Sequence, residues 1–327
     1  MGRSAPLNSS QMEEDLQSLE ESLDGLARIA FVHGRPDEAL NLRRRILGIY
    51  AVDRPENPHH HVSRICASVR LAQDLLAVGQ RDEAATLLRE GVEVVKEVAD
   101  HETIKASTLE TSIELNLVLG RMLEEDGLPN QAEDHYRLAN SSLDKLKPET
   151  TDAYFRGFFE CRLALADLLK RCHRSPGEAR EFYLAYANVL QTVTKKHPQS
   201  PSAPAALARF YANCPDGSLR DYQRALEYAE KALELAPQHP NSQLAFALIS
   251  VRLEKWNEAI QHLNLAMEYG GPDAVKMYLM AMAQHQAGNA AEAETWFSKA
   301  EQWLIRHNFK DLRARQFQAE AKAVLPN

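Results

Sequence analysis

The sequence has 327 residues, of which 44% are hydrophobic, and a formal net charge of -8. This composition is ordinary for a globular protein and argues against disorder of the whole chain. The negative charge creates no field that attracts nucleic acid, and the one tight run of arginines, 43 to 45, lies between Leu42 and Ile46. No apolar run approaches the roughly 18 residues of a membrane span, and no signal-peptide core is present, so we expect a cytoplasmic protein.

The first part of the chain carries a repeated pattern of glycine and alanine. Residues 1–12 are polar, and we expect them to form a disordered tail. Within residues 13–196, a Gly is followed five residues later by an Ala in three stretches, which begin at Gly34, Gly79 and Gly127. A degenerate unit places Ala179 at the same position without the Gly. Apolar residues recur at helical spacing on both sides of each turn, which predicts a pair of amphipathic helices per unit.

The last third of the chain repeats this pattern at a fixed period. Residues 197–204, "HPQSPSAP", combine three prolines with two serines, and we predict a hinge there. Residues 205–305 follow with three units in which the marker alanines, Ala225, Ala259 and Ala293, lie 34 residues apart. A strict period of this length is typical of stacked helical repeats.

Small residues mark the positions where neighbouring helices are predicted to touch. In the stretch from Arg224 to Pro237, three alanines fall at steps of four and three: Ala225, Ala229 and Ala232. Small side chains allow two helix axes to approach closely, and hairpins of this kind are stable only when they stack. Residues 306–327 keep Phe317 and Ala321 near one helical face, so we predict a C-terminal capping helix.

These residues resemble the tetratricopeptide repeat (TPR), a helix hairpin of 34 residues. The likeness rests on small residues in both helices, a Leu or aromatic residue four positions after the marker Ala, and a terminal Pro. The matching residues are Pro237, Ala247, Ala259, Leu263, Ala266, Ala281, Gly288, Ala293, Phe297 and Ala300. The longer units within 13–196 resemble the extended-helix variant of kinesin light chains. The resemblance covers about residues 17 to 305 and implies an all-α, right-handed superhelix of about seven hairpins with a C-terminal capping helix.

The final third is also similar to the C-terminal repeat regions of bacterial serine/threonine protein kinases of the planctomycete type. The stretches "LARFYANCPDGSLRDYQRALEYAEKALELAP" and "YLMAMAQHQAGNAAEAETWFSKAEQWL" carry this similarity. The kinase signatures H-R-D and D-F-G are missing from the sequence. The similarity therefore implies the appendage of such a kinase and not its catalytic domain.

No motif of the sequence predicts catalysis. The glycines never form G-x-G, and neither a phosphate-binding loop nor a nucleophile elbow is present. Three adjacent histidines, 59 to 61, are metal candidates, but they could face one ion only from a loop, because successive helical side chains point about 100° apart. We interpret them as a solvated helix start after Pro58. The sequence therefore predicts no enzyme, no cofactor and no metal site.

The candidate partner site is the inner face of the repeats. In the TPR family the first helix of each unit lines the concave surface, so the resemblance assigns the groove positions by register. In the last two units these positions are largely apolar: Leu244, Leu248, Val251, Arg252, Tyr278, Met282 and His285. Two interpretations stay open: a peptide binds there, or the capping helix or a neighbouring subunit already covers this face.

The function predicted from these features is a non-catalytic scaffold for protein–protein interaction. A peptide or a partner helix would bind in the groove, anchored by apolar contacts near Tyr278 and Met282. The alternative is a regulatory or sensor region of a bacterial serine/threonine protein kinase, separated from its catalytic domain. The expected partners are proteins or peptides, with no nucleic acid and no membrane span, and the oligomeric state stays open.

Overall fold

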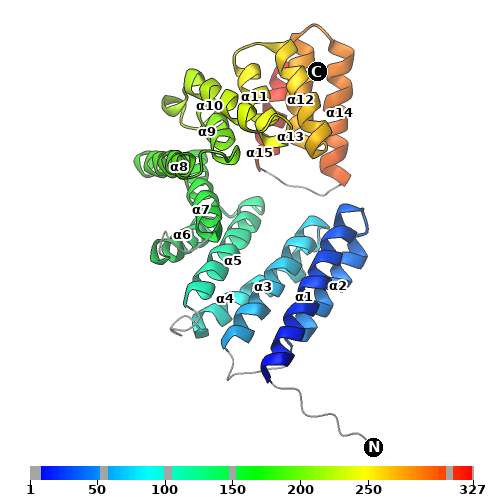
Figure 1. Ribbon diagram of the computed structural model, residues 1–327, viewed down its shortest axis with the longest axis vertical. Coiled ribbons are helices and arrows are strands. Elements are labelled where there is room, and N and C mark those ends of the chain that lie inside the picture. Colours follow the sequence, from blue (N-terminus) through cyan, green and yellow to red (C-terminus); the bar gives the residue numbers. More distant parts are fainter. Residues whose placement is uncertain (1–8, 52–57, 99–104, 147–151, 307–311, 326–327) are drawn as a thin grey trace, which may run out of the picture. The chain divides into compact units, whose positions relative to one another are not determined.

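The structure is a computed structural model that describes residues 9–51, 58–98, 105–146, 152–306 and 312–325. In these residues the regular elements are helices, without a strand, as the sequence predicts (Figure 1). The α-helices are α1 (Ser9–Val32), α2 (Pro36–Ile49), α3 (Pro58–Ala77), α4 (Arg81–Val98), α5 (Lys105–Glu125), α6 (Pro129–Lys145), α7 (Asp152–Arg171), α8 (Pro176–Lys196), α9 (Ser202–Asn213), α10 (Tyr222–Leu235), α11 (Pro240–Arg252), α12 (Trp256–Gly270), α13 (Ala274–Gln286), α14 (Ala290–Arg306) and α15 (Leu312–Val324).

The helices pair as hairpins in chain order, from α1 with α2 to α13 with α14, and α15 follows as the predicted C-terminal helix. For α7 and α8 the pairing is seen in a hydrogen bond of 2.6 Å, which the Tyr183 hydroxyl donates to Asp167. The described part of the chain therefore confirms the predicted seven hairpins.

The helix α1 begins at Ser9, so residues 9–12 of the predicted tail are helical. Good helix formers such as Gln11 and Met12 explain this early start.

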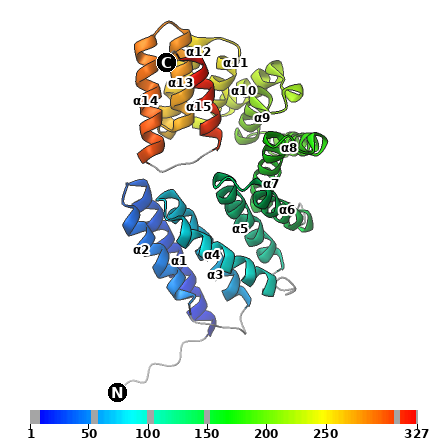
Figure 2. The same cartoon turned by 180° about the vertical axis from the view of Figure 1, so that it is seen from behind.

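The chain divides into two compact units, residues 1–161 (unit 1) and 162–327 (unit 2). The boundary falls inside α7. The predicted hinge at 197–204 lies within unit 2, where it supplies the turn before α9 and the first residues of that helix, and it stays a prediction. In unit 2 the first helices of successive hairpins, α9, α11 and α13, contact one another in that order (Figure 2).

The marker alanines are buried in every hairpin. At most 1% of each residue is exposed, for Ala39, Ala84, Ala132, Ala179, Ala225, Ala259 and Ala293. Four residues later, the large side chains of Tyr136, Tyr183 and Leu263 are also buried, while Phe297 is half-buried. A methyl group at the marker position lets the two helices of a hairpin approach, and the larger residue one turn later fills the adjoining space.

Four of the marker alanines have a glycine five residues earlier, and this glycine has a backbone role. Gly34, Gly79, Gly127 and Gly288 have φ between 72° and 89°, in the left-handed region that suits a residue without a Cβ. Each ends the first helix of its hairpin and reverses the chain. Glu254 occupies the same position, five residues before Ala259, and adopts φ 61° despite its side chain.

Two arginines link helices of unit 1, and one of them belongs to the run at 43 to 45. Arg43, on α2, is 6% exposed and forms ion pairs with Asp24 of α1 and with Asp74 of α3, the latter at 2.9 Å. Burial raises the pKa of Asp74, and the guanidinium of Arg43 opposes that rise. A second bridge runs from Arg81 of α4 to Glu125 and Asp126, at 2.9 and 2.6 Å. These arginines are structural links between consecutive helices.

Candidate functional site

The seven residues predicted to line the groove lie on two first helices of unit 2. The helix α11 carries Leu244, Leu248, Val251 and Arg252, and α13 carries Tyr278, Met282 and His285. Tyr278 is fully buried, and Leu248, Val251 and Met282 are at most 6% exposed. Leu244, Arg252 and His285 are half-buried. Most of the predicted face is therefore inaccessible in this structure.

The C-terminal helix α15 covers part of this face. It packs against α13, and Figure 2 shows it beside that helix. Its buried side chains are Ala314, Phe317 and Ala321, with exposed fractions of 1%, 5% and 0%. They lie three and four residues apart, so they form one stripe along the helix. The structure thus agrees with the interpretation in which the capping helix covers the first helices.

A charged contact fastens α15 to α11. The two terminal nitrogens of Arg252 donate to the two carboxylate oxygens of Glu320, at 2.7 and 3.1 Å. The side chains of this pair are 20% and 29% exposed, and the guanidinium lies 5.9 Å from the centre of the Phe317 ring. Arg252 also donates to Asn213, at the end of α9. This bidentate ion pair is more directional than a single contact to a point charge.

A second polar contact fastens α15 to the last hairpin. The Tyr278 hydroxyl donates to Glu301 of α14 at 2.5 Å, and the amide of Gln318 donates to the same carboxylate oxygen at 2.5 Å. Burial and the neighbouring Glu301 carboxylate raise the pKa of Tyr278, so the phenol stays protonated and keeps donating. We call the surface formed by Asn213, Arg252, Tyr278 and Glu301 the docking face.

The sequence identified only part of this arrangement. Arg252 and Tyr278 were predicted as site residues, and both contact α15 or its immediate partner Glu301. Glu320, Gln318 and Glu301 were missed. The available signal was the spacing of Phe317 and Glu320, which places an aromatic ring and a carboxylate on neighbouring positions of one helix face.

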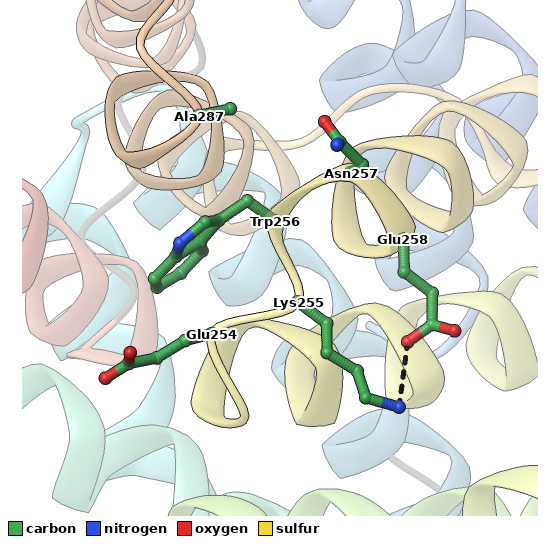
Figure 3. A pocket seen from close by; sticks show the side chains of 6 residues that line it. All are labelled: Glu254, Lys255, Trp256, Asn257, Glu258 and Ala287. Carbon is green, nitrogen blue, oxygen red and sulfur yellow. Dashed lines mark ion pairs between the residues drawn. The ribbon is translucent and has the colours of Figure 1, made fainter.

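A shallow pocket lies elsewhere in unit 2, at the turn between α11 and α12 (Figure 3). Its volume is about 410 Å³, and its lining residues are Glu254, Lys255, Trp256, Asn257, Glu258 and Ala287. Lys255 pairs with Glu258 at 3.5 Å. The lining residues include no Ser, Thr, Cys or His. Over the described residues, no three His, Cys, Asp or Glu side chains gather as a metal ion would require.

The comparison with protein families identifies one matching segment. Residues 218–300 match the family model described as anaphase-promoting complex, cyclosome, subunit 3. The match begins in the turn before α10, ends inside α14 and covers less than half of the chain. No similar sequence was found among curated proteins.

Solved structures provide similar helical arrays. The apo form of RapI is 15% identical, covers 93% of this chain and 80% of its own, and has a TM-score of 0.46. A thermophilic TPR protein of Thermus thermophilus is 17% identical over 64% of this chain and 99% of its own, with a TM-score of 0.42. PilF of Pseudomonas aeruginosa is 19% identical over 78% and 97%, with a TM-score of 0.41. At these identities and scores the likenesses carry no argument about function.

The hairpins, the 34-residue period and the matching segment together define the chain as a TPR-like repeat protein. Within the described residues, every helix is too short or too polar to cross a lipid bilayer.

Proposed function

We propose that the chain is a non-catalytic scaffold that binds a peptide or a helix of a partner protein on the first helices of unit 2. The observation that carries this proposal is the docking of α15. The docking face already holds this helix through the buried ring of Phe317 and the bidentate ion pair between Arg252 and Glu320. A surface that fits one amphipathic helix can fit another with the same spacing of contacts.

The chemistry of the docking face supports recognition of protein. Arg252 offers two parallel donors to a carboxylate, and the ring of Phe317 beneath it shows that an aromatic side chain fits next to the guanidinium. Arginine and large aromatic residues are enriched among the residues that dominate binding energy at interfaces.

The proposal includes a cytoplasmic location and right-handed stacking of the hairpins. The kinase-linked alternative has no specific support from the described contacts and stays a prediction of the sequence.

The proposal is tested by selecting random peptides, displayed on phage, against the immobilised full-length chain. Selected peptides should protect the backbone amides of α11 and α13 from hydrogen exchange. Arg252→Glu should weaken their binding by about tenfold or more, because the surface charge reverses. The matched control, Arg89→Glu on the exposed surface of α4 in unit 1, should leave the affinity unchanged. Absence of any selected peptide, or protection confined to other helices, would contradict the proposal.

A further inference from the structure

The helix α15 contacts the preceding helices of unit 2 as a ligand would. Its polar side chains reach three different helices: Gln316 lies 3.5 Å from Asn213 of α9, Glu320 pairs with Arg252 of α11, and Gln318 bonds Glu301 of α14. Its buried stripe faces α13. One short helix therefore joins successive hairpins across the docking face.

Few large apolar side chains attach α15 to the preceding helices. Among its described side chains, Phe317 is the one large residue that is buried, and Ala314 and Ala321 contribute only methyl groups. The helix has 13 residues, a length at which an isolated helix is marginal in water. Its outward residues include Arg315 and Lys322, which are exposed. The contacts of α15 therefore depend strongly on Phe317 and on the ion pair of Glu320.

The contacts also specify what else could occupy the docking face. A helix needs an aromatic residue to fill the position of Phe317, and a carboxylate three residues later to meet Arg252. Small residues must stand three positions before and four positions after the aromatic residue, as Ala314 and Ala321 do. A larger side chain at these positions would hold the helix away from α13.

We propose that α15 is a built-in ligand of the docking face, and that a partner helix with the same pattern of small, aromatic and acidic residues binds by displacing it. This inference rests on the proposed scaffold function. Residues 307–311 connect α14 to α15, so the competing helix is always present at a high local concentration. The apparent affinity for the partner is then the intrinsic affinity multiplied by the fraction of molecules in which α15 has been released. The smaller this fraction, the weaker the observed binding.

The test uses the full-length chain and a fluorescent synthetic peptide with the sequence of residues 312–325. Glu320→Arg places two positive charges together and releases α15, while it leaves Arg252 available to the Glu of the peptide. We expect this variant to bind the peptide about tenfold or more tightly than the wild-type chain does, measured by fluorescence anisotropy.

Two charge variants separate displacement from general loosening of unit 2. Arg252→Glu also releases α15 but repels the peptide, so it should bind no better than wild type. The double variant Arg252→Glu/Glu320→Arg restores an ion pair with reversed charges, and it should both hold α15 and reject the peptide. Equal peptide binding by Glu320→Arg and wild type, or tight binding by Arg252→Glu, would overturn the inference.

A second measurement needs no variant. Excess peptide added to the wild-type chain should accelerate hydrogen exchange in the chain's own residues 312–325, because those amides are released when the peptide takes their place. Unchanged exchange at saturating peptide would overturn displacement. If library-selected peptides bind the wild-type chain and Glu320→Arg does not alter their affinity, the proposed scaffold function stands and this inference fails.

Discussion

Units 1 and 2 hold their helices together by different means. In unit 1, Arg43 bridges α1 and α3 from a buried position on α2, and Arg81 bridges α4 and α5. In the last three hairpins of unit 2, the residues seven positions after the marker alanines are themselves fully buried alanines: Ala232, Ala266 and Ala300. The first marker alanine of unit 2, Ala179, is instead followed at this position by the buried Tyr186. The equivalent residues of unit 1 differ in size and are Ile46, Gly91 and Ala139.

The difference shows how a regular period arises. The 34-residue spacing reflects short first helices, because α11 and α13 have 13 residues each, whereas α3 and α5 of unit 1 have 20 and 21. The recurring alanine gives successive contacts of these short hairpins the same size. Where contact sizes vary, directional ion pairs help to fix how one hairpin meets the next. In unit 2 the half-buried Arg252 instead pairs with Glu320 of the added helix α15. The buried arginine of unit 1 therefore links consecutive hairpins, whereas Arg252 of unit 2 links the C-terminal helix α15 to α11.

Removal of the buried arginine should have the largest effect on this comparison. Arg43→Met keeps most of the aliphatic stem but leaves Asp24 and Asp74 without their shared partner. We expect the free energy of unfolding to fall by about 3 to 5 kcal/mol at pH 7, measured by urea unfolding. The loss should shrink as the pH falls, because the variant raises the native pKa of Asp74 further, and protonation then favours the native state.

The adjacent arginine provides the control. Arg44 pairs with Glu83 at 2.9 Å, but the side chains are 47% and 44% exposed. Arg44→Met should therefore change the free energy of unfolding by less than about 1 kcal/mol. Equal losses for the two variants would mean that burial of Arg43 does not govern the stability of unit 1.

The close contact between α11 and α12 in unit 2 can be disrupted by a larger side chain at the marker position. Ala259 on α12 is fully buried at the marker position. Ala259→Leu should reduce the free energy of unfolding by about 1 to 3 kcal/mol, because the added atoms force α11 and α12 apart. Ala291→Leu, at an exposed position of α14, makes the same chemical change without a buried contact and should have little effect. A match between the two melting curves would show that the register of this hairpin is incorrect.

The sequence predicted the hairpins because their signals are local. Marker alanines, turn glycines and apolar spacing all lie within a few residues of the helices that they specify. The burial of Arg43 was not predicted, since its partners Asp24 and Asp74 are distant in sequence and a run of arginines usually indicates an exposed surface. Only the folded arrangement of three helices reveals that one arginine of the run points inward.

The candidate site was predicted in part for the same reason. Register alone placed Tyr278 and Met282 on the inner side of the first helices, and both are buried there. Register could not choose between a free groove and a covered one, because that depends on where α15 packs. The ion pair between Arg252 and Glu320 joins residues 68 positions apart, beyond the reach of periodicity.

The smallest predicted effect concerns a turn of unit 2 that departs from the glycine pattern. Glu254 adopts φ 61°, whereas its counterpart in the next hairpin, Gly288, adopts φ 89°. A residue with a Cβ is disfavoured in this region by about 1 kcal/mol. Among the described residues, the Glu254 side chain has no ion pair that the change would remove. Glu254→Gly should therefore stabilise unit 2 by up to about 1 kcal/mol in urea unfolding. The reciprocal change, Gly288→Ala, should destabilise it by a similar amount, and if Glu254→Gly lowered stability, the carboxylate itself would have to make a favourable contact at the α11–α12 turn.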